Sequence, residues 1–124
     1  MLEKEQGRYL ITQRRPTATL PMLWEFPGGR VQDGESDAAA LTRSIKDRLG
    51  IDVVVDGQAS KMKHDYPEYE VEFSVFHCRL KDPAQQVSPA KINDHRWVKV
   101  TEMKEYKFPD VDARTLDFLL ESDG

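Results

Sequence analysis

The sequence predicts one α/β domain spanning residues 1–124, and three observations support this prediction. The chain has 124 residues, 39% of them hydrophobic, which is enough to bury one core and too few for two independent domains. Segments with the alternating pattern of strands lie on both sides of a stretch with helical periodicity at 36–49. A second helical stretch begins near Asp110, so strands and helices are mixed along the chain.

The first clear strand is expected over residues 8–14. A Gln-Gly turn signal at 6–7 precedes it, and Pro16 ends it because proline cannot continue a central strand. An aromatic segment at 24–26 then leads into a Pro-Gly-Gly turn at 27–29. Such a turn exposes backbone groups, so it is the first place where local structure suggests chemistry.

The helix at 36–49 is predicted to be amphipathic. Ser36 is a suitable N-cap, and Gly50 is a helix stop. Four apolar residues at helical spacing form its expected buried face: Ala38, Leu41, Ile45 and Leu49.

The second half of the chain begins with a predicted hairpin. Residues 51–55 and 69–80 look extended, with a turn at 66–68 between them. Residues 81–93 contain prolines and polar residues and are expected to form a surface loop, after which 95–100 is a strand.

Two helices are expected at the C-terminal end. Thr101 is the expected cap of a short helix that runs to Tyr106. The last helix starts near Asp110 and buries four apolar residues: Val111, Leu116, Leu119 and Leu120.

Composition narrows the classes of function. Charged residues make up 32% of the chain but the net charge is only -4, so charge alone does not indicate a nucleic-acid partner. Nucleic acid stays open as a partner, because a local basic site can lie on an acidic protein. The sequence has no apolar run long enough to cross a bilayer and no signal peptide in residues 1–7, so we expect no membrane partner.

Cysteine and histidine usage favours a reducing compartment. The single cysteine, Cys78, cannot form an internal disulfide, and no Cys/His cluster has zinc-ligand spacing, which fits a cytoplasmic location. The scattered histidines His64, His77 and His95 are interpreted as packed or surface residues rather than general bases.

Three separated signatures in this chain resemble those of the Nudix family, in particular its MutT-like members. Residues 29–51 resemble the Nudix box, which is a glycine, five residues, a glutamate, seven residues, and then Arg-Glu-apolar-x-Glu-Glu-x-Gly-apolar. The lead-in at 24–29 and the late segment at 106–112 also look like those of MutT-like members, so the resemblance covers nearly the whole chain. Four residues keep the register of the box: Gly29, Glu35, Arg43 and Gly50.

The resemblance implies a Nudix fold, in which a mixed β-sheet is sandwiched between helices. It also implies cleavage of a nucleoside diphosphate linked to another group, with divalent ions such as Mg²⁺ that neutralise phosphate oxygens and activate water. The metal is held by carboxylates one helical turn apart and by an exposed carbonyl of the glycine loop. Positions 44, 47 and 48 share a helix face and are glutamates in the family pattern. In this chain they are Ser44, Asp47 and Arg48.

Because only one of the three carboxylates remains, we expect metal binding to be weak or lost. Gly29 and Asp47 are the remaining candidates for metal ligands, and Glu35 and Asp47 are the candidates for catalysis. Asp33 is a further candidate in a weakened metal site. The partnership of Glu35 with Arg43 is expected to be a loop-to-helix ion pair that orients the box.

The family often takes a further carboxylate from the loop before the late strand. This chain offers four polar residues there: Lys91, Asn93, Asp94 and His95. Asp94 could serve as a ligand, or Lys91 could place a fixed cation at that point. The sequence leaves both alternatives open.

Three residues are expected to bind substrate: Arg14, Arg48 and Asp112. Arg14 matches an arginine that MutT-like members place beside the substrate, and arginine matches phosphate geometry with a rigid fork of donors. Asp112 matches a position that contacts the base, although it could also cap the last helix.

Two functions are therefore weighed. The first is a Nudix domain that binds a nucleotide or nucleoside-diphosphate-type ligand through a degenerate box, with little or no pyrophosphohydrolase activity. The second is a weak Mg-dependent, MutT-like nucleoside triphosphate pyrophosphohydrolase.

The start of the sheet carries a further expectation. MutT-like domains begin with an apolar strand before the turn at 6–7, and residues 1–4 supply about half of the usual five or six residues of a strand. A shortened strand leaves a neighbouring strand with unpaired backbone groups. We expect either that the natural protein extends upstream or that a strand from a second copy fills the gap in a homodimer.

Overall fold

Strands and helices are mixed along the chain, as predicted. The computed structural model describes residues 1–4, 7–18, 21–65, 67 and 70–108. Within these ranges, no helix has the length and apolar character needed to cross a membrane. The elements in chain order are β1 (Leu2–Lys4), β2 (Arg8–Gln13), β3 (Trp24–Glu25), α1 (Asp37–Leu49), β4 (Val53–Asp65), β5 (Glu70–Leu80), the 3₁₀ helix η2 (Pro89–Lys91), β6 (Asp94–Lys99) and the 3₁₀ helix η3 (Val100–Glu105).

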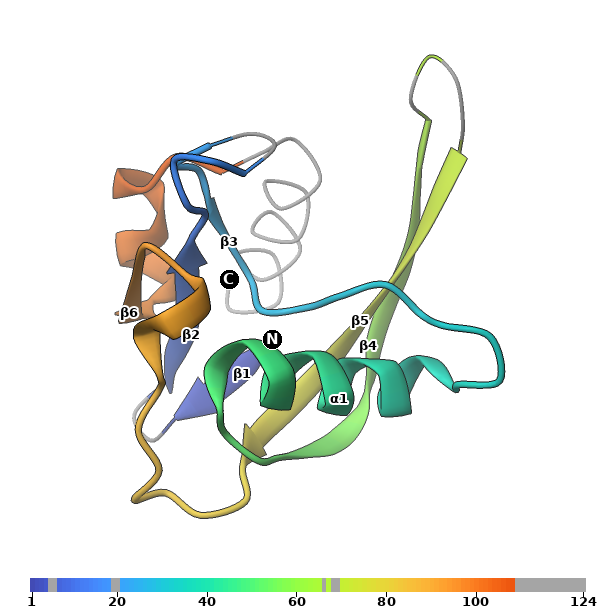
Figure 1. The fold of residues 1–124 in the computed structure, drawn as a ribbon, viewed down its shortest axis with the longest axis horizontal. Helices are drawn as coiled ribbons and strands as arrows, with labels where there is room; N and C mark the ends of the chain where they lie inside the picture. The colour runs from blue at the N-terminus through green and yellow to red at the C-terminus, as the bar shows by residue number, and fades with distance from the viewer. Residues whose placement is uncertain (5–6, 19–20, 66, 68–69, 109–124) are drawn as a thin grey trace.

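The six strands form one mixed sheet, with α1 lying across one of its faces (Figure 1). The strand order is β3-β2-β1-β5-β4. β1 and β3 pair with opposite ends of β2, whereas β6 pairs with β2 along its whole length. β1 runs parallel to β5, whereas the other pairs are antiparallel. The α/β class and the mixed sheet are therefore confirmed. The helix expected from Asp110, and with it Asp112, lies outside the described residues.

The two faces of the sheet carry separate apolar clusters. Leu10 on β2 packs in the cluster that includes Ile45 and Leu49 of α1. Its neighbours Tyr9 and Ile11 pack in the second cluster, with β6 and η3. Adjacent residues of a strand point to opposite faces, so β2 is buried on both sides and is the central strand of the core.

Helix α1 begins and ends where the sequence predicts. The Ser36 side chain accepts a hydrogen bond from the Ala39 N–H at 3.1 Å, so Ser36 is the N-cap. Gly50 has a φ of 69°, in the left-handed region, and its N–H donates to the Lys46 carbonyl at 3.0 Å. Ser44 is a buried polar residue on the inner part of the helix that the predicted apolar face did not include.

The hairpin of β4 and β5 is confirmed, but β4 is much longer than the predicted strand at 51–55. Its polar second half is extended because it pairs along its length with β5, not because it is buried. Cross-strand ion pairs accompany this pairing, including one of 2.7 Å between Lys61 and Glu72. The last residues of β4 and the first residues of β5 project beyond the rest of the sheet (Figure 1).

The predicted cap of the segment after β6 is wrong. Thr101 lies inside η3, and the Glu102 carboxylate accepts the hydrogen bond from the Lys99 backbone N–H at 2.9 Å. A carboxylate that reaches back to the backbone N–H of the N-cap residue stabilises the start of a helix, and it satisfies a different donor from the one that a threonine cap would satisfy.

The short first strand is paired on both sides. β1 lies between β2 and β5, and Leu2 is 1% exposed. Cys78, its register partner on β5, is a buried free cysteine, as expected for a core residue. The expectation of an upstream extension or of a second copy stays a prediction.

Candidate functional site

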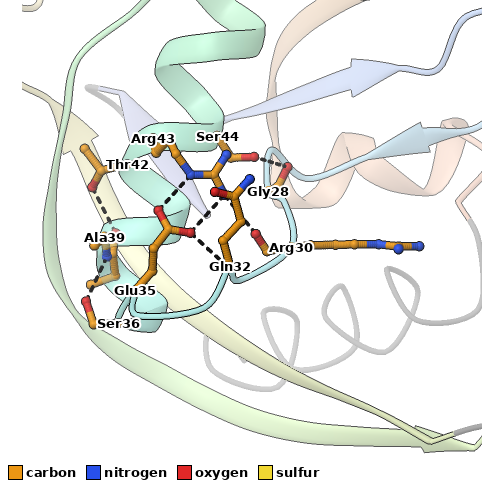
Figure 2. Close-up of polar contacts among 10 residues, drawn as sticks. Gly28, Arg30, Gln32, Glu35, Ser36, Ala39, Thr42, Arg43 and Ser44 are labelled. Carbon is orange, nitrogen blue, oxygen red and sulfur yellow. Dashed lines mark hydrogen bonds and ion pairs between the residues drawn. The ribbon is translucent and has the colours of Figure 1, made fainter.

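The glycine turn after β3 packs directly on α1. A Cβ at Gly29 would lie 1.7 Å from Ser44 Oγ and 2.6 Å from Ser44 Cβ, which is closer than real Cβ atoms approach. The Ser44 hydroxyl donates a hydrogen bond of 3.4 Å to the Gly28 carbonyl (Figure 2). A glycine in the turn and a small residue on the helix therefore depend on each other.

A loop-to-helix ion pair fixes the segment between this turn and α1 (Figure 2). Arg43 Nε lies 2.7 Å from Glu35 Oε2, and Arg43 Nη2 lies 3.1 Å from Glu35 Oε1. This is the two-pronged geometry in which guanidinium and carboxylate bind most strongly. Arg43 also donates to the Arg30 carbonyl, and Glu35 accepts from the Gln32 backbone N–H, each at 2.9 Å. The expected pair is thus present, and Arg43 holds two points of the loop on the helix, Glu35 and the Arg30 carbonyl.

The same contacts shift the pKa values of both partners. The Arg43 side chain, followed by the Gln32 N–H, lowers the pKa of Glu35 below its ordinary value of 4.5. Glu35 in turn raises the pKa of Arg43. Both oxygens of Glu35 are engaged in these bonds, so this carboxylate is poorly placed to act as a base or as a metal ligand.

A cavity of about 310 Å³ lies beside the C-terminal half of α1, the ends of β2 and β3, and the loop that carries η2. This volume is at the lower end of the range for small-molecule sites, so it suits a phosphate chain or part of a nucleotide. The lining residues are Thr12, Arg14, Arg15, Thr17, Ala18, Glu25, Pro27, Gly28, Ser44, Ile45, Asp47, Arg48, Leu49, Lys91 and Ile92.

Cationic side chains outnumber carboxylates in this cavity. The cations are Arg14, Arg15, Arg48 and Lys91, and the carboxylates are Glu25 and Asp47. Arg14 Nη1 lies 3.0 Å from Glu25 Oε2. Lys91 Nζ lies 3.1 Å from Asp47 Oδ1. Because both carboxylates have a cationic partner, the cavity is positive on a chain whose net charge is -4.

Lys91 reaches the cavity from residues 88–93, which we call the strap. Arg15 also contacts the strap, by donating a hydrogen bond to the Ala90 carbonyl. Backbone hydrogen bonds hold both ends of the strap: the Ser88 N–H to the Leu49 carbonyl at 2.8 Å, and the Asn93 N–H to the Gln13 carbonyl at 3.0 Å. The strap is thus attached to the ends of both α1 and β2, which places Lys91 between them.

Of the two alternatives that the sequence leaves open before β6, Lys91 lines the cavity and Asp94 does not. The Asp94 carboxylate accepts a hydrogen bond from the His95 backbone N–H at 2.7 Å and pairs with the Arg96 guanidinium. These bonds engage it within β6. The segment before β6 therefore contributes the Lys91 ammonium to the cavity and not the Asp94 carboxylate.

The donor set around Asp47 does not fit a magnesium ion. Nowhere in the described part of the chain do three His, Cys, Asp or Glu side chains come together as metal ligands. The Lys91 ammonium lies against Asp47, and Arg48 lines the same cavity. Magnesium requires near-octahedral oxygen ligation, which one carboxylate already paired with an ammonium does not provide.

The structure brings some predicted site residues together and separates others. Three of them line the cavity: Arg14, Asp47 and Arg48. Four others are not among its lining residues and instead hold the loop and the helix in place: Gly29, Glu35, Arg43 and Gly50. Asp33 is exposed in the loop before α1. Asp112 lies outside the described residues.

Sequence reasoning missed Glu25 and Arg15 as cavity residues. A signal for Glu25 was present, because it lies between Trp24 and Phe26, which both pack against the second cluster. Alternation along a strand turns Glu25 to the other face, toward its cross-strand partner Thr12, which also lines the cavity. No comparable signal marked Arg15, since its place depends on the path of the strap.

Comparison with known proteins supports one family. The model of the NUDIX domain family matches residues 1–118. An 8-oxo-dGTP diphosphatase of Proteus vulgaris is 35% identical over 72 residues, 58% of this chain and 64% of that protein. A CTP pyrophosphohydrolase of Escherichia coli (strain K12) is 38% identical over 52 residues, 42% of this chain and 38% of that protein. The match thus spans less than two thirds of the length of these two relatives.

Comparison with solved structures supports the fold. The solution structure of the E. coli ORF135 protein superposes with a TM-score of 0.79 at 22% identity, and the match covers 97% of this chain and 84% of that one. This agreement confirms the predicted Nudix fold. Because the family model matches residues 1–118, which is nearly the whole chain, the chain belongs to the NUDIX domain family.

Proposed function

We propose that this NUDIX domain binds a nucleotide or a similar nucleoside-diphosphate-type ligand through fixed cations, with little or no pyrophosphohydrolase activity. The observation that carries the proposal is the excess of positive charge in the cavity. Four cationic side chains line it, against two carboxylates that are each paired with one of those cations. A cavity of this composition favours an anionic ligand.

Arg48 is the side chain best placed to bind a phosphate group. It lines the cavity, and within the described ranges its side chain forms no hydrogen bond or ion pair with another residue. A guanidinium presents its donors in a planar fork that matches two phosphate oxygens, and it keeps its charge at any pH of interest. Arg14 supplies a second guanidinium, which its contact with Glu25 holds in position.

The low activity follows from the residues at the three metal positions of the box. Nudix hydrolases generally use divalent ions, which neutralise phosphate oxygens and activate water. Here Ser44 is buried against the glycine turn, Asp47 is paired with Lys91, and Arg48 is cationic. These residues support binding of phosphate without supporting activation of water.

A second function, weak Mg-dependent pyrophosphohydrolysis, is favoured by one observation. The Asp47 side chain is 64% exposed, so an ion could reach it if Lys91 moved away. The relatives named as 8-oxo-dGTP diphosphatase and CTP pyrophosphohydrolase supply the first substrates to test, 8-oxo-dGTP and CTP.

One set of measurements separates the two functions. Turnover of these nucleotides with magnesium is expected to stay far below the order of one per second that is ordinary for enzymes. Calorimetry with a nucleoside diphosphate should give the same affinity with EDTA as with magnesium. Turnover at ordinary rates, or binding that EDTA abolishes, would instead establish the metal-dependent hydrolase.

The role of Arg48 can be tested against a matched arginine. Arg48→Ala should weaken nucleotide binding in EDTA by about tenfold or more, as expected for the loss of a charge-assisted contact. Arg79→Ala is the control, because Arg79 is also exposed but pairs with Asp56 and is not among the residues lining the cavity. Equal affinities of the two variants would remove Arg48 from the site.

A further inference from the structure

We propose that Lys91 is the built-in cation of this cavity, positioned by Asp47 to bind a ligand phosphate and to keep a divalent ion off Asp47. The inference rests on the proposed function, because it concerns how the same cavity recognises phosphate. It assigns Asp47 the part of a positioning residue for an ammonium, in place of a metal ligand.

The ion pair between the two residues joins separate parts of the fold. Lys91 Nζ lies 3.1 Å from Asp47 Oδ1, although the residues are 44 positions apart in sequence. Asp47 comes from α1 and Lys91 from the strap, which hydrogen bonds attach to the ends of α1 and β2. The ammonium is therefore held where the fold brings the strap against the helix.

Stability alone does not account for this pair. The side chains of Lys91 and Asp47 are 53% and 64% exposed, and exposed ion pairs contribute little to the free energy of unfolding. Exposure also leaves donors free, since an ammonium has further N–H groups beyond the one directed at Asp47. Lys91 lines the cavity, so a phosphate oxygen bound there can accept a hydrogen bond from one of these groups.

On this proposal, the pair also keeps a divalent ion away from Asp47. A divalent ion at Asp47 would have to displace the Lys91 ammonium or lie beside it, with Arg48 lining the same cavity. Coulomb repulsion between cations at such separations opposes binding, and the two carboxylates of the cavity, each already paired with a cation, offer too few ligands to offset it. Lys91 and the metal therefore compete for the same carboxylate.

Substitution of Lys91 tests this competition without any nucleotide. Lys91→Glu places a second carboxylate beside Asp47, and Mn²⁺ binding measured by electron paramagnetic resonance should become at least about tenfold tighter than in the wild type. Adding Asp47→Asn to this variant should abolish the gain. Lys46→Glu is the matched control. Lys46 is an exposed lysine on the same helix as Asp47, it pairs with a different carboxylate, Asp52, at 3.4 Å, and it is not a cavity-lining residue.

Nucleotide binding supplies the second measurement. Lys91→Gln, which keeps the length but removes the charge, should weaken binding of ADP in EDTA by about tenfold. Circular dichroism melts identify any variant that fails to fold. If Lys91→Glu fails to fold, Lys91→Gln replaces it in the Mn²⁺ titration, where a smaller increase in Mn²⁺ affinity is expected.

The results separate this inference from the proposed function. Wild-type binding of ADP in EDTA with no loss in Lys91→Gln would overturn the inference and leave the proposed function standing. Failure of the wild type to bind ADP in EDTA would overturn the proposed function, and with it the phosphate contact of Lys91. Tight Mn²⁺ binding by the wild type that Asp47→Asn removes would overturn the competition between lysine and metal.

Discussion

Ser44 occupies a position where the Nudix pattern has a glutamate, and it is 5% exposed beneath the glycine turn. Its small size has a consequence for the backbone, because Gly28 and Gly29 approach it closely. A longer side chain at 44 would have to push the turn away from α1. The small size of Ser44 and the close packing of the turn are therefore two aspects of one arrangement.

Gly29→Ala should destabilise the fold by about 1–3 kcal/mol, the usual cost of overpacking. The added Cβ would meet Ser44 Cβ at 2.6 Å, so rotation of the serine hydroxyl cannot relieve the contact. Reduced chain entropy in the unfolded state offsets only about 0.4–1 kcal/mol of this cost. Urea unfolding of a double-mutant cycle with Ser44→Gly measures the effect, since Ser44→Gly should recover most of the loss. Additive effects of the two substitutions would contradict the contact.

At the scale of elements, helix α1 carries two different functions along its length. Its midpoint is attached to the loop through Arg43 and Glu35, whereas its last turn presents Asp47 and Arg48 to the cavity. The sequence was sufficient to predict this helix, because its cap, its stop and its apolar spacing are all local signals. The ion pair of Lys91 with Asp47 had no such signal, since it depends on where the strap crosses the helix.

Strand lengths show the same division between local and non-local signals. The apolar start of β4 was predicted, but its polar continuation was not, because it is stabilised by β5 across the hairpin. Similarly, the spacing of residues could not predict whether Lys91 or Asp94 lines the cavity. Hydrogen bonds within β6 engage Asp94, and only the folded strap brings Lys91 to the cavity.

The loop-to-helix connection should make stability depend on pH through Glu35. Its pKa is lower in the folded protein than its ordinary value of 4.5, mainly because of Arg43. The stabilisation is therefore fully present above that value and is lost as the pH falls through the lowered pKa. Glu35→Gln should be less stable than the wild type at about pH 7, and the difference should shrink toward about pH 3.

Chemical unfolding at both pH values measures this difference, with Glu105→Gln as the control for removing one exposed carboxylate. The control should show little difference from the wild type at either pH. A gap between Glu35→Gln and the wild type that is equally large at both pH values would mean that the charge of Glu35 is not what holds the loop.

At the scale of the whole molecule, the charge of the cavity opposes that of the chain. The net charge is -4, yet the cavity lining contains more cations than carboxylates. Composition could not reveal this local reversal, because it depends on which residues the fold brings together. The fold itself was predictable, since three signatures of the family occur in order along the chain.

Salt should therefore weaken the binding of phosphate ligands, despite the overall negative charge. A phosphate bound as proposed would lie within contact distance of the cavity cations, whereas the other carboxylates of the chain would act on it from farther away and be screened more strongly. The Debye length falls from about 10 Å at 0.1 M to about 3 Å at 1 M, so added salt reduces the local attraction.

Calorimetry in EDTA over this range of salt should show a steeper loss of affinity for a nucleoside triphosphate than for the monophosphate. The uncharged nucleoside is the control and should show little dependence on salt. Triphosphate affinity that stayed constant or rose with salt would mean that the net charge governs binding and that the cavity is not an anion site.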